Sequence, residues 1–486
     1  APFANTYSLD YDGIDDFVST NSKIIGSDIT LSGWVNFNGS YSVFSAHFPM
    51  SITPSNLGVG NETLGRFYKN GSKLQIAIQC NDNTGANFST YFVDSTTLEG
   101  AGWQHICLTY NVTTGHIYAY LNGVAQNWVK IFAASTPVPF LTAVSGRVYE
   151  SNLTIGRLNP TTSTGTFLGL VDEVSTYDKI LTQAEITSIS AAPSDLTNLS
   201  PTLWLRNGDN GSYKSPQWLI PNNENKDKVS NYSFDFDGID DYINIGNAIS
   251  FEYNDAFSYS FWINPDSDSG VKYLFSKYAS SRGILIYLNS SSAAANNTLN
   301  FNLYNIGSGT PSGRKYITTN STNMALPNEW TNIVITYDGS GLGSGISFYK
   351  NGVAQSVTVT NDSLASNTIL TSQNAYISGN NFASSFYPGK QDEWAIFNTE
   401  LSSADALAIY NSGEPTTLPS GAVAHYKMGE DATFSGGVWT VPDSAGSNNG
   451  TSNGMTIEDR VGDAPNSTSN ALSYNMDEVD RVEDTP

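Results

Sequence analysis

The sequence predicts an all-β protein with two tandem antiparallel domains, each containing one short helix. The main reason is an internal repeat, because residues 7–17 (YSLDYDGIDDF) return as residues 232–242 (YSFDFDGIDDY). In both copies large apolar residues alternate with polar ones, as in a half-buried strand, and Asp-Gly then favours a turn. The second reason is composition, since 42 glycines and only 14% charged residues suit many short strands. With 486 residues the chain also exceeds one ordinary domain.

Matched strand patterns follow in the same order in both halves. The first half has them at 29–37, 73–80, 103–110 and 117–126, and the second at 257–264, 299–304, 330–337 and 346–355. An Asn-Gly pair interrupts the last pattern of each half, which is a strong hairpin signal. Both halves are therefore expected to be successions of strands and turns.

One helix is expected near the end of each half. Thr182 and Glu185, like Ser402 and Asp405, have the spacing of a capping box ahead of apolar residues. Each helix follows a strand that carries an Asp-Glu pair.

The repeats divide the chain into four parts. We expect one domain over 1–200, a bridge over 201–229, a second domain over 230–415, and a C-terminal bridge with a truncated third repeat over 416–486. Residues 472–482 are a blurred copy of the opening strand, with apolar residues still at alternate positions. A strand left unpaired would be an exposed edge. We therefore expect it to fold back on the second domain or to add to a sheet of a neighbouring subunit, so that it supports assembly.

The charge balance excludes two classes of partner. The formal net charge is −23, and such a chain repels nucleic acid and anionic lipid. No apolar run reaches the length of a membrane-spanning helix. We expect no nucleic-acid partner and no membrane insertion.

The two cysteines are expected to be free thiols. Strand alternation places Cys80 on an inner face with Leu74 and Ile76, whereas Cys107 points outward between Ile106 and Leu108. Residues on opposite faces of neighbouring strands do not meet disulfide geometry.

Together these features resemble the laminin-G-like, pentraxin-related branch of the concanavalin A-like lectin/glucanase superfamily. The features are the FDGIDDY strand, the WxxIxxTY strand, the Asn-Gly-Val hairpin and the Asp-Glu strand followed by a short helix, and they recur over about 7–190 and 232–412. The resemblance implies that each domain is a two-sheet antiparallel jelly-roll sandwich of concanavalin A-like fold. Trp34, Trp103, Trp262 and Trp330 recur at matched positions and are expected in the cores rather than as sugar platforms.

The bridges add a second resemblance, to linkers in virion proteins of tailed, especially marine, bacteriophages. It rests on residues 427–430, on Pro442-Asp443-Ser444 and on the ending at 480–486.

The family resemblance also implies a structural calcium that joins the opening segment to the aspartate of the closing strand. On that pattern Asp172 and Asp392 would be ligands, because calcium prefers carboxylate and carbonyl oxygens. The alternative is that both Asp-Glu pairs only end a strand. Asp15, Asp16, Asp240 and Asp241 are expected to form turns.

No enzyme signal is found in the sequence. The glucanases of the superfamily use Glu-x-Asp-x-x-Glu, and this spacing occurs at Glu478, Asp480 and Glu483, but near the chain end and without aromatic flanks. The four histidines, His47, His105, His116 and His425, have no metal-ligand spacing, and no Ser-His-Asp grouping with a nucleophile elbow is present.

The sequence therefore predicts a non-enzymatic virion structural protein, such as a fibre, decoration or appendage subunit, with lectin-like domains that adhere to surface glycans. Its partners would be other virion proteins or copies of itself. The alternative is a secreted bacterial adhesin or extracellular filament subunit at the cell surface, and a glycan hydrolase is disfavoured.

Overall fold

The computed structural model describes most of the chain. The described residues are 5–20, 24–26, 28–37, 50–54, 63–70, 73–81, 88–93, 101–130, 137–142, 149–157, 166–223, 228–247, 249–266, 270–279, 282–290, 298–306, 314–380, 385–467 and 470–486. Some of them, including 50–54, 63–70, 73–81 and 88–93, are described by backbone alone.

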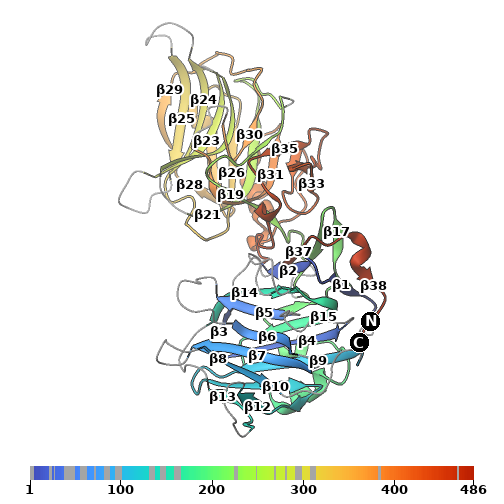
Figure 1. Ribbon diagram of the computed structural model, residues 1–486. Helices are drawn as coiled ribbons and strands as arrows, with labels where there is room; N and C mark the ends of the chain where they lie inside the picture. Colours follow the sequence, from blue (N-terminus) through green and yellow to red (C-terminus); the bar gives the residue numbers. More distant parts are fainter. Residues whose placement is uncertain are drawn as a thin grey trace. The chain divides into compact units, whose positions relative to one another are not determined.

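The chain forms two compact units, and the first is made from two separate segments. Unit 1 contains residues 1–227 and 468–486, and unit 2 contains residues 228–467. In Figure 1 the late strands β37 and β38 accordingly lie with the blue and green strands of unit 1. Unit 2 is thus inserted into the sequence of unit 1.

Two antiparallel sheets make up the described part of unit 1. The first contains, in spatial order, β11 (Val124–Ala125), β10 (His116–Leu121), β9 (Trp103–Tyr110), β4 (Ile29–Phe37), β15 (Leu168–Tyr177), β1 (Ser8–Asp12) and β38 (Arg481–Val482), with β13 (Leu141–Thr142) beside β10 and β16 (Leu203–Leu205) beside β15. The second contains β12 (Trp128–Lys130), β8 (Phe88–Val93), β7 (Lys73–Asn81), β6 (Thr63–Asn70), β5 (Met50–Pro54), β14 (Tyr149–Ile155), β2 (Phe17–Thr20), β37 (Ala471–Tyr474), β18 (Gln217–Ile220) and β17 (Ser212–Lys214), with β3 (Ile24–Gly26) beside β14.

Unit 2 repeats this plan. Its first sheet contains β28 (Val353–Gln355), β27 (Ile346–Lys350), β26 (Thr331–Tyr337), β21 (Phe257–Pro265), β31 (Pro388–Phe397), β19 (Ser233–Asp237) and β36 (Arg460–Val461), with β32 (Ala422–Tyr426) beside β31. Its second sheet contains β29 (Thr358–Asp362), β25 (Arg314–Ser321), β24 (Thr298–Ile306), β23 (Arg282–Ser290), β22 (Gly270–Ala279), β30 (Tyr376–Ile377), β20 (Tyr242–Asn244), β35 (Gly450–Asn453), β34 (Val438–Val441) and β33 (Thr433–Ser435). The predicted all-β fold of two sandwiches is confirmed.

The sequence repeat is a repeat of strand register. Trp34 lies opposite Asp172 in unit 1, and Trp262 lies opposite Asp392 in unit 2. Because a slip of one residue would move every side chain to the other face, identical register means that equivalent residues share equivalent surroundings.

The predicted helices cover the outer face of the first sheet in each unit. α1 (Gln183–Ile189) and α2 (Ser403–Tyr410) begin with the expected capping boxes, Thr182 with Glu185 and Ser402 with Asp405. Under α1 lies a small apolar cluster that includes Cys107, Ile186 and Trp204, separate from the inter-sheet core.

None of the four repeated tryptophans lies in the inter-sheet core, which differs from the core prediction. Trp34 and Trp262 are buried, but on the outer sheet face, where Trp262 stacks on Tyr410 of α2. Trp103 and Trp330 are only half-buried, and their indole nitrogens donate to Asp484 and Asp463 respectively.

The terminal segment does not go where the sequence analysis placed it. β37 pairs with β2 on one side and β18 on the other, and β38 pairs with β1, so the strand is internal to unit 1. Its counterpart is not the opening strand but the β35–β36 segment of unit 2. Trp218 donates to Ser473 and Asp477 as Trp439 donates to Ser452 and Thr456. The expected burial of an alternating apolar face was correct, but the receiving sheet belongs to the first unit.

Candidate functional site

The Asp-Glu pair of each unit lies at a β-bulge in the closing strand. The register of β15 on β4 shifts between Asp172 and Ser175, and Glu173 has a positive φ of 49°. Glu393 in β31 has the same φ of 49°. A bulge re-aims side chains, and both acidic residues of each pair are buried as a result.

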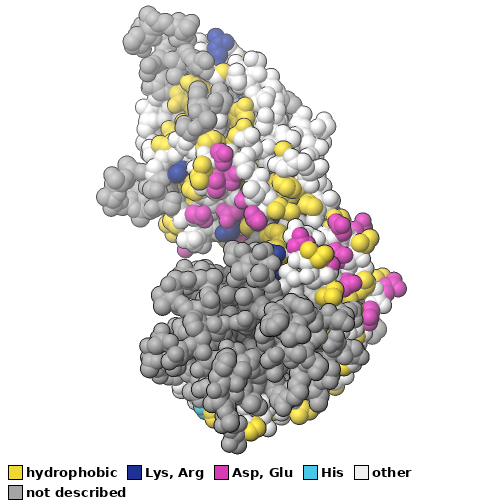
Figure 2. All heavy atoms as spheres, viewed as in Figure 1, with side chains coloured by type: hydrophobic (Ala, Val, Ile, Leu, Met, Phe, Trp, Pro, Cys, Tyr) yellow, Lys and Arg dark blue, Asp and Glu magenta, His cyan; other side chains and the backbone are white. Residues whose placement is uncertain are grey.

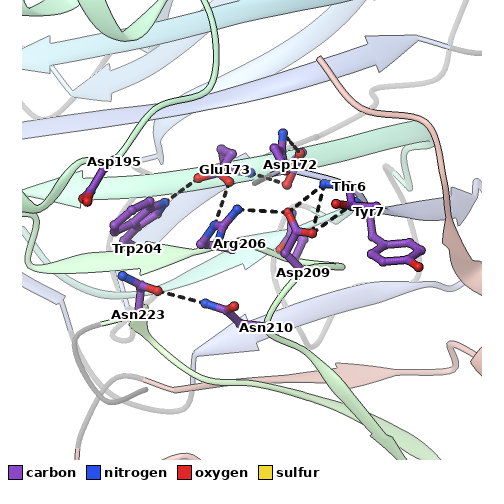
Figure 3. A network of polar contacts seen from close by, with 12 residues as sticks. Thr6, Tyr7, Asp172, Glu173, Asp195, Trp204, Arg206, Asp209, Asn210 and Asn223 are labelled. Atoms are coloured by element: carbon purple, nitrogen blue, oxygen red, sulfur yellow. Dashed lines mark hydrogen bonds and ion pairs between the residues drawn. The ribbon is translucent and has the colours of Figure 1, made fainter. Parts of the chain in front are cut away.

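In unit 1 the buried glutamate belongs to a charge-paired network (Figure 3). Glu173 accepts from the Trp204 indole nitrogen at 2.5 Å and from Arg206 Nε at 2.9 Å. A terminal nitrogen of Arg206 donates to Asp209 at 3.1 Å. Burial raises the pKa of the Glu173 carboxyl, and the Arg206 charge opposes that shift. The positive charge of Arg206 thus balances the negative charges of two carboxylates.

The same network ties down the opening strand. Asp209 accepts from the backbone nitrogens of Thr6 and Tyr7, at 3.0 and 3.3 Å. Gly208 permits this approach, since a Cβ there would lie 2.7 Å from Tyr7. The network is therefore a clasp between the bulge, the bridge and the N-terminal strand.

Unit 2 has the equivalent clasp with different chemistry. Glu393 contacts the His425 ring nitrogen Nε2 at 2.5 Å, where unit 1 has the Trp204 indole. Glu430 accepts from the backbone nitrogens of Asn231 and Tyr232, as Asp209 does in unit 1. The position of Arg206 is taken by Lys427, and the buried Arg460 donates to the backbone carbonyls of Gly429 and Ala432.

Lys427 does not replace the arginine, since its side chain forms no ion pair within the described part of unit 2. Glu393 Oε1 and Glu430 Oε2 are consequently buried without a hydrogen-bond donor among the described residues. Burial and the neighbouring Glu393 raise the pKa of Glu430 to about 8. Burial, with Glu430 and Glu393 nearby, also raises the pKa of Asp392 well above its usual value.

At the residues expected to bind calcium each carboxylate oxygen has a hydrogen-bond donor, and calcium binding there stays a prediction. Asp172 accepts from Asn5 Nδ2 at 2.9 Å and from the Glu173 backbone nitrogen at 2.8 Å, so each of its oxygens has a donor. Asp392 likewise accepts from Ser230 at 2.6 Å and from the Glu393 nitrogen at 2.8 Å. Their geometry fits the alternative expectation, in which they organise a strand end.

At the two Asp-Gly turns, acidic side chains lie closer together than those of the Asp-Glu pairs. Within the described residues, three carboxylates lie within 4.8 Å of one another only in the sets Asp12, Asp15, Asp16 and Asp237, Asp240, Asp241. The last member of each set accepts from the backbone nitrogen of the first, at 2.8 and 2.9 Å, which is the turn-forming role expected of them. Burial raises the pKa of Asp16 and of Asp241 to about 7. These acidic clusters could bind a metal ion.

The candidate catalytic triplet lies in the terminal segment that closes unit 1. Glu478 and Glu483 are exposed, and Asp480 accepts from the backbone nitrogen of Asp477 in a short 3₁₀ turn. The fold does assemble a Ser-His-Glu chain that spacing did not reveal. Ser444 Oγ lies 2.9 Å from His425 Nδ1, and the other nitrogen of that ring contacts Glu393.

The remaining predicted residues are the two cysteines and three of the histidines. Cys107 is a buried free thiol on the outward side of its strand, as predicted, and burial raises its pKa. Burial lowers the pKa of His105 to about 3, and His116 stacks on Phe140. The Cys80 side chain and His47 lie outside the described residues.

The outer face of the second sheet of unit 2 carries an aromatic surface. Tyr273 and Tyr278 of β22, Tyr287 of β23 and Tyr304 of β24 are all half-buried, and none belongs to the core. We call these four residues the tyrosine face. Tyr273 lies opposite Tyr287, with ring centroids 5.6 Å apart, and the rings of Tyr278 and Tyr304 lie 5.5 Å apart.

One glycine and one amide hold the tyrosine face together. Tyr278 and Tyr304 both pair with Gly283, and the missing side chain there lets their rings meet across β23. A Cβ at Gly283 would clash with the Lys277 carbonyl at 1.9 Å. The buried Asn302 amide lies 3.2 Å from the Tyr287 hydroxyl and 2.9 Å from the Tyr304 hydroxyl, so it links the two pairs.

The surroundings of the tyrosine face are uncharged. The register also places Ser276, Leu285, Asn300, Thr318 and Asn320 on this face, and none of them carries a charge. Elsewhere, on the face of the molecule shown in Figure 2, acidic side chains are more widespread than basic ones. A neutral aromatic surface therefore stands out on an acidic protein.

Comparison with known proteins identifies relatives of this fold. A family model described as the concanavalin A-like lectin/glucanases superfamily matches residues 12–187 and 237–406. A search of curated proteins finds no match. No described helix is long and apolar enough to cross a membrane.

Among solved structures, the chain is similar to a heptameric SAP-like pentraxin from Limulus polyphemus, at 13% identity and a TM-score of 0.29, covering 39% of this chain and 84% of that one. It is also similar to domains LG4-5 of the mouse laminin α1 chain, at 10% identity and a TM-score of 0.25, covering 82% and 89%. A third is the CBM40 of Ruminococcus gnavus IT-sialidase bound to α2,3 sialyllactose, at 10% identity and a TM-score of 0.28, covering 37% and 95%. No ligand is carried over from them.

Proposed function

Because the chain belongs to the concanavalin A-like lectin/glucanase superfamily, we propose that it is a non-catalytic carbohydrate-binding protein. The observation that carries the proposal is the tyrosine face of unit 2. Tyrosine combines an apolar ring with a polar hydroxyl, which suits a ligand that has both C–H faces and hydroxyl groups. The Asn302 amide fixes two of the hydroxyls, so that the surface is formed before a ligand arrives.

The chemistry of the face supports a neutral sugar ligand. The side chains named on it are phenols, amides, hydroxyls and a leucine, with no charge to attract an ionic ligand. The hydroxyl of Tyr287 accepts from Asn302, and its own hydrogen has no acceptor among the described residues. That hydrogen is available to a ligand oxygen.

The same chemistry supports a binding role rather than hydrolysis. Glycoside hydrolysis uses a pair of carboxyl groups on either side of the scissile bond. The described residues of the tyrosine face include no carboxylate. A glycan held there would be bound and released unchanged.

The sequence predicts where the protein works, namely on a virion or outside a bacterial cell, and this stays a prediction. The motifs behind the virion expectation have roles inside the sandwiches, since Glu430 binds the opening strand and Asp484 accepts from Trp103. The fold alone accounts for the presence of these motifs. From the tyrosine face we propose adhesion to surface glycans, with the chain acting as a virion subunit or as an extracellular bacterial adhesin. Its proposed partners are other virion proteins or copies of the chain.

A glycan array probed with the labelled full-length chain tests the proposal. We expect binding to a set of neutral glycans, lost in Tyr287→Ala and in Asn302→Ala. Tyr410→Ala is the matched control, because Tyr410 is also half-buried but lies on α2. An array without binding, or binding that both variants of the face retain, would overturn the assignment to the tyrosine face.

A further inference from the structure

We infer that the ligand of unit 2 is a linear, uncharged polysaccharide that lies across the strands of the second sheet, from the tyrosine face to a further pair of tyrosines, Tyr242 and Tyr376. The inference rests on the proposed carbohydrate binding and adds the class of glycan and the extent of its site. Tyr242 belongs to β20 and Tyr376 to β30, and the centroids of their rings lie 5.5 Å apart.

The register places this pair on the same side of the sheet as the tyrosine face. Tyr376 lies opposite Ser276, which is on the outer face between two of the tyrosines of β22. The neighbours of the pair, Ile243 and Ile377, lie opposite each other and belong to the core of unit 2. Because side chains alternate along a strand, Tyr242 and Tyr376 point outward.

Tyrosines thus occupy five consecutive strands of one sheet. β24, β23, β22, β30 and β20 are hydrogen-bonded neighbours in that order, and each contributes at least one tyrosine to the outer face. Adjacent strands lie about 4.8 Å apart, so four spacings extend the row over roughly 19 Å. A row of that length exceeds one sugar ring and suits several consecutive rings of an extended chain.

The new pair is also held in position before a ligand arrives. Tyr242 and Tyr376 are half-buried, and the buried ring of Phe386 stacks on Tyr242 with centroids 6.1 Å apart. A ring that is already immobilised loses little further freedom when a ligand binds.

The chemistry beside the pair favours an uncharged polymer. Asn244 lies opposite Tyr376 and Thr451, and Asn453 lies opposite Tyr242, so the pair is flanked by amides and a hydroxyl. Such groups donate to and accept from sugar hydroxyls. The net charge of −23 disfavours acidic polysaccharides in addition.

Unit 1 shows that the fold does not require a tyrosine pair at this place. By register, Thr154 is the counterpart of Tyr376 and Phe17 is the counterpart of Tyr242. A threonine also suits a strand, and Thr154 is buried.

The end of the row is covered in unit 1. Tyr474 stacks on Phe17 with centroids 4.7 Å apart, the Arg157 guanidinium lies 4.8 Å from the centre of the same ring, and Phe17 is buried. Asn453 and Gly379 stand at the positions of Tyr474 and Arg157 in unit 2. The half-exposed pair is therefore a feature of unit 2 and not of the shared fold.

Titration of the full chain with oligosaccharides of increasing length tests the inference. The probes are disaccharides to octasaccharides from linear β-glucan, mannan, xylan and galactan, measured by calorimetry and, for weak binding, by NMR. For the chain type that binds, we expect affinity to rise with length over several sugars and then to level off.

Variants of the pair locate the rise in affinity. Tyr376→Thr places the unit 1 residue in unit 2 and should weaken binding of the longest oligosaccharides by about tenfold, without changing disaccharide binding. Tyr242→Ala should act in the same direction, and it keeps the test valid if Tyr376→Thr disturbs β30. Tyr287→Ala should remove binding at every length, whereas Tyr410→Ala should change nothing.

The possible failures separate this inference from the proposed function. Affinity that does not depend on length, or a rise with length that both Tyr376→Thr and Tyr242→Ala retain, would overturn the inference and leave the tyrosine face as a smaller site. Tighter binding of polygalacturonate than of any neutral polymer would overturn the uncharged class. No binding of any neutral glycan would overturn both proposals.

Discussion

Arg206 Nε lies 2.9 Å from Glu173 Oε1, with the side chains of both residues largely buried. Removing one member of a buried ion pair leaves the other without a counter-charge and costs about 3–5 kcal/mol. Arg206→Met should therefore lower the free energy of unfolding of unit 1 by about that amount. Urea unfolding, followed by probes assigned to each unit, is the measurement.

A half-exposed pair supplies the control for this substitution. Lys228 lies 3.6 Å from Glu414 in unit 2, with side chains 27% and 32% exposed. Lys228→Met should cost only about 0–1 kcal/mol. If both substitutions had equally small effects, the Arg206 clasp would not stabilise unit 1.

Unit 2 should lose stability as the pH rises, measured with a chelator present. The Glu430 carboxyl has a pKa near 8 when folded and an ordinary value of 4.5. A carboxyl with a raised folded-state pKa binds its proton more tightly when folded, so its contribution is fully present below about pH 4.5 and is lost through about pH 8. The pKa of Asp392 is shifted in the same direction.

Lys427→Arg should flatten this pH dependence, because the guanidinium favours the ionised carboxyl. Urea midpoints of the parent and the variant at several pH values between about 5 and 9 give the comparison. A parent midpoint that rises over this range would contradict the raised pKa.

Deleting residues 468–486 should unfold or loosen unit 1 and leave unit 2 intact. β37 lies between β2 and β18, so its loss exposes two strand edges and removes the partners of Trp218. We expect limited proteolysis of the truncated chain to spare a fragment that covers 228–467. Loss of both units together, or of neither, would contradict this division.

The sequence predicted the fold because local signals and the repeat agree. Capping boxes at Thr182 and Ser402 and strand alternation are local features, and both units show them. The terminal segment was misplaced because its pairing partners, β2 and β18, lie more than 200 residues earlier in the chain. Strand alternation shows that a face must be buried, but not against which sheet.

The candidate sites were less predictable for a similar reason. The contacts of Arg206 with Glu173 and Asp209 depend on a β-bulge that no local sequence pattern predicts. The tyrosine face depends on three neighbouring strands and on Gly283, which lets two rings meet. Its four tyrosines are spread over β22, β23 and β24, and strand register alone shows which of them are adjacent.

The last prediction concerns the Ser444, His425 and Glu393 chain, which we expect to be structural. Ser444 donates to the His425 carbonyl at 3.1 Å as well as contacting the ring, so its hydroxyl is engaged in ending the strand. The ring itself stands where unit 1 has Trp204, which contacts the equivalent glutamate without any catalytic capacity.

The chain should accordingly turn over neither chromogenic esters nor β-glucans, and a fluorophosphonate probe should not label it. Ser444→Ala and Glu478→Gln should match the parent in each assay, with folding checked by circular dichroism. Turnover that only Ser444→Ala removes would make the Ser-His-Glu chain catalytic. Turnover that only Glu478→Gln removes would make the terminal triplet catalytic, and either result would refute the non-catalytic assignment.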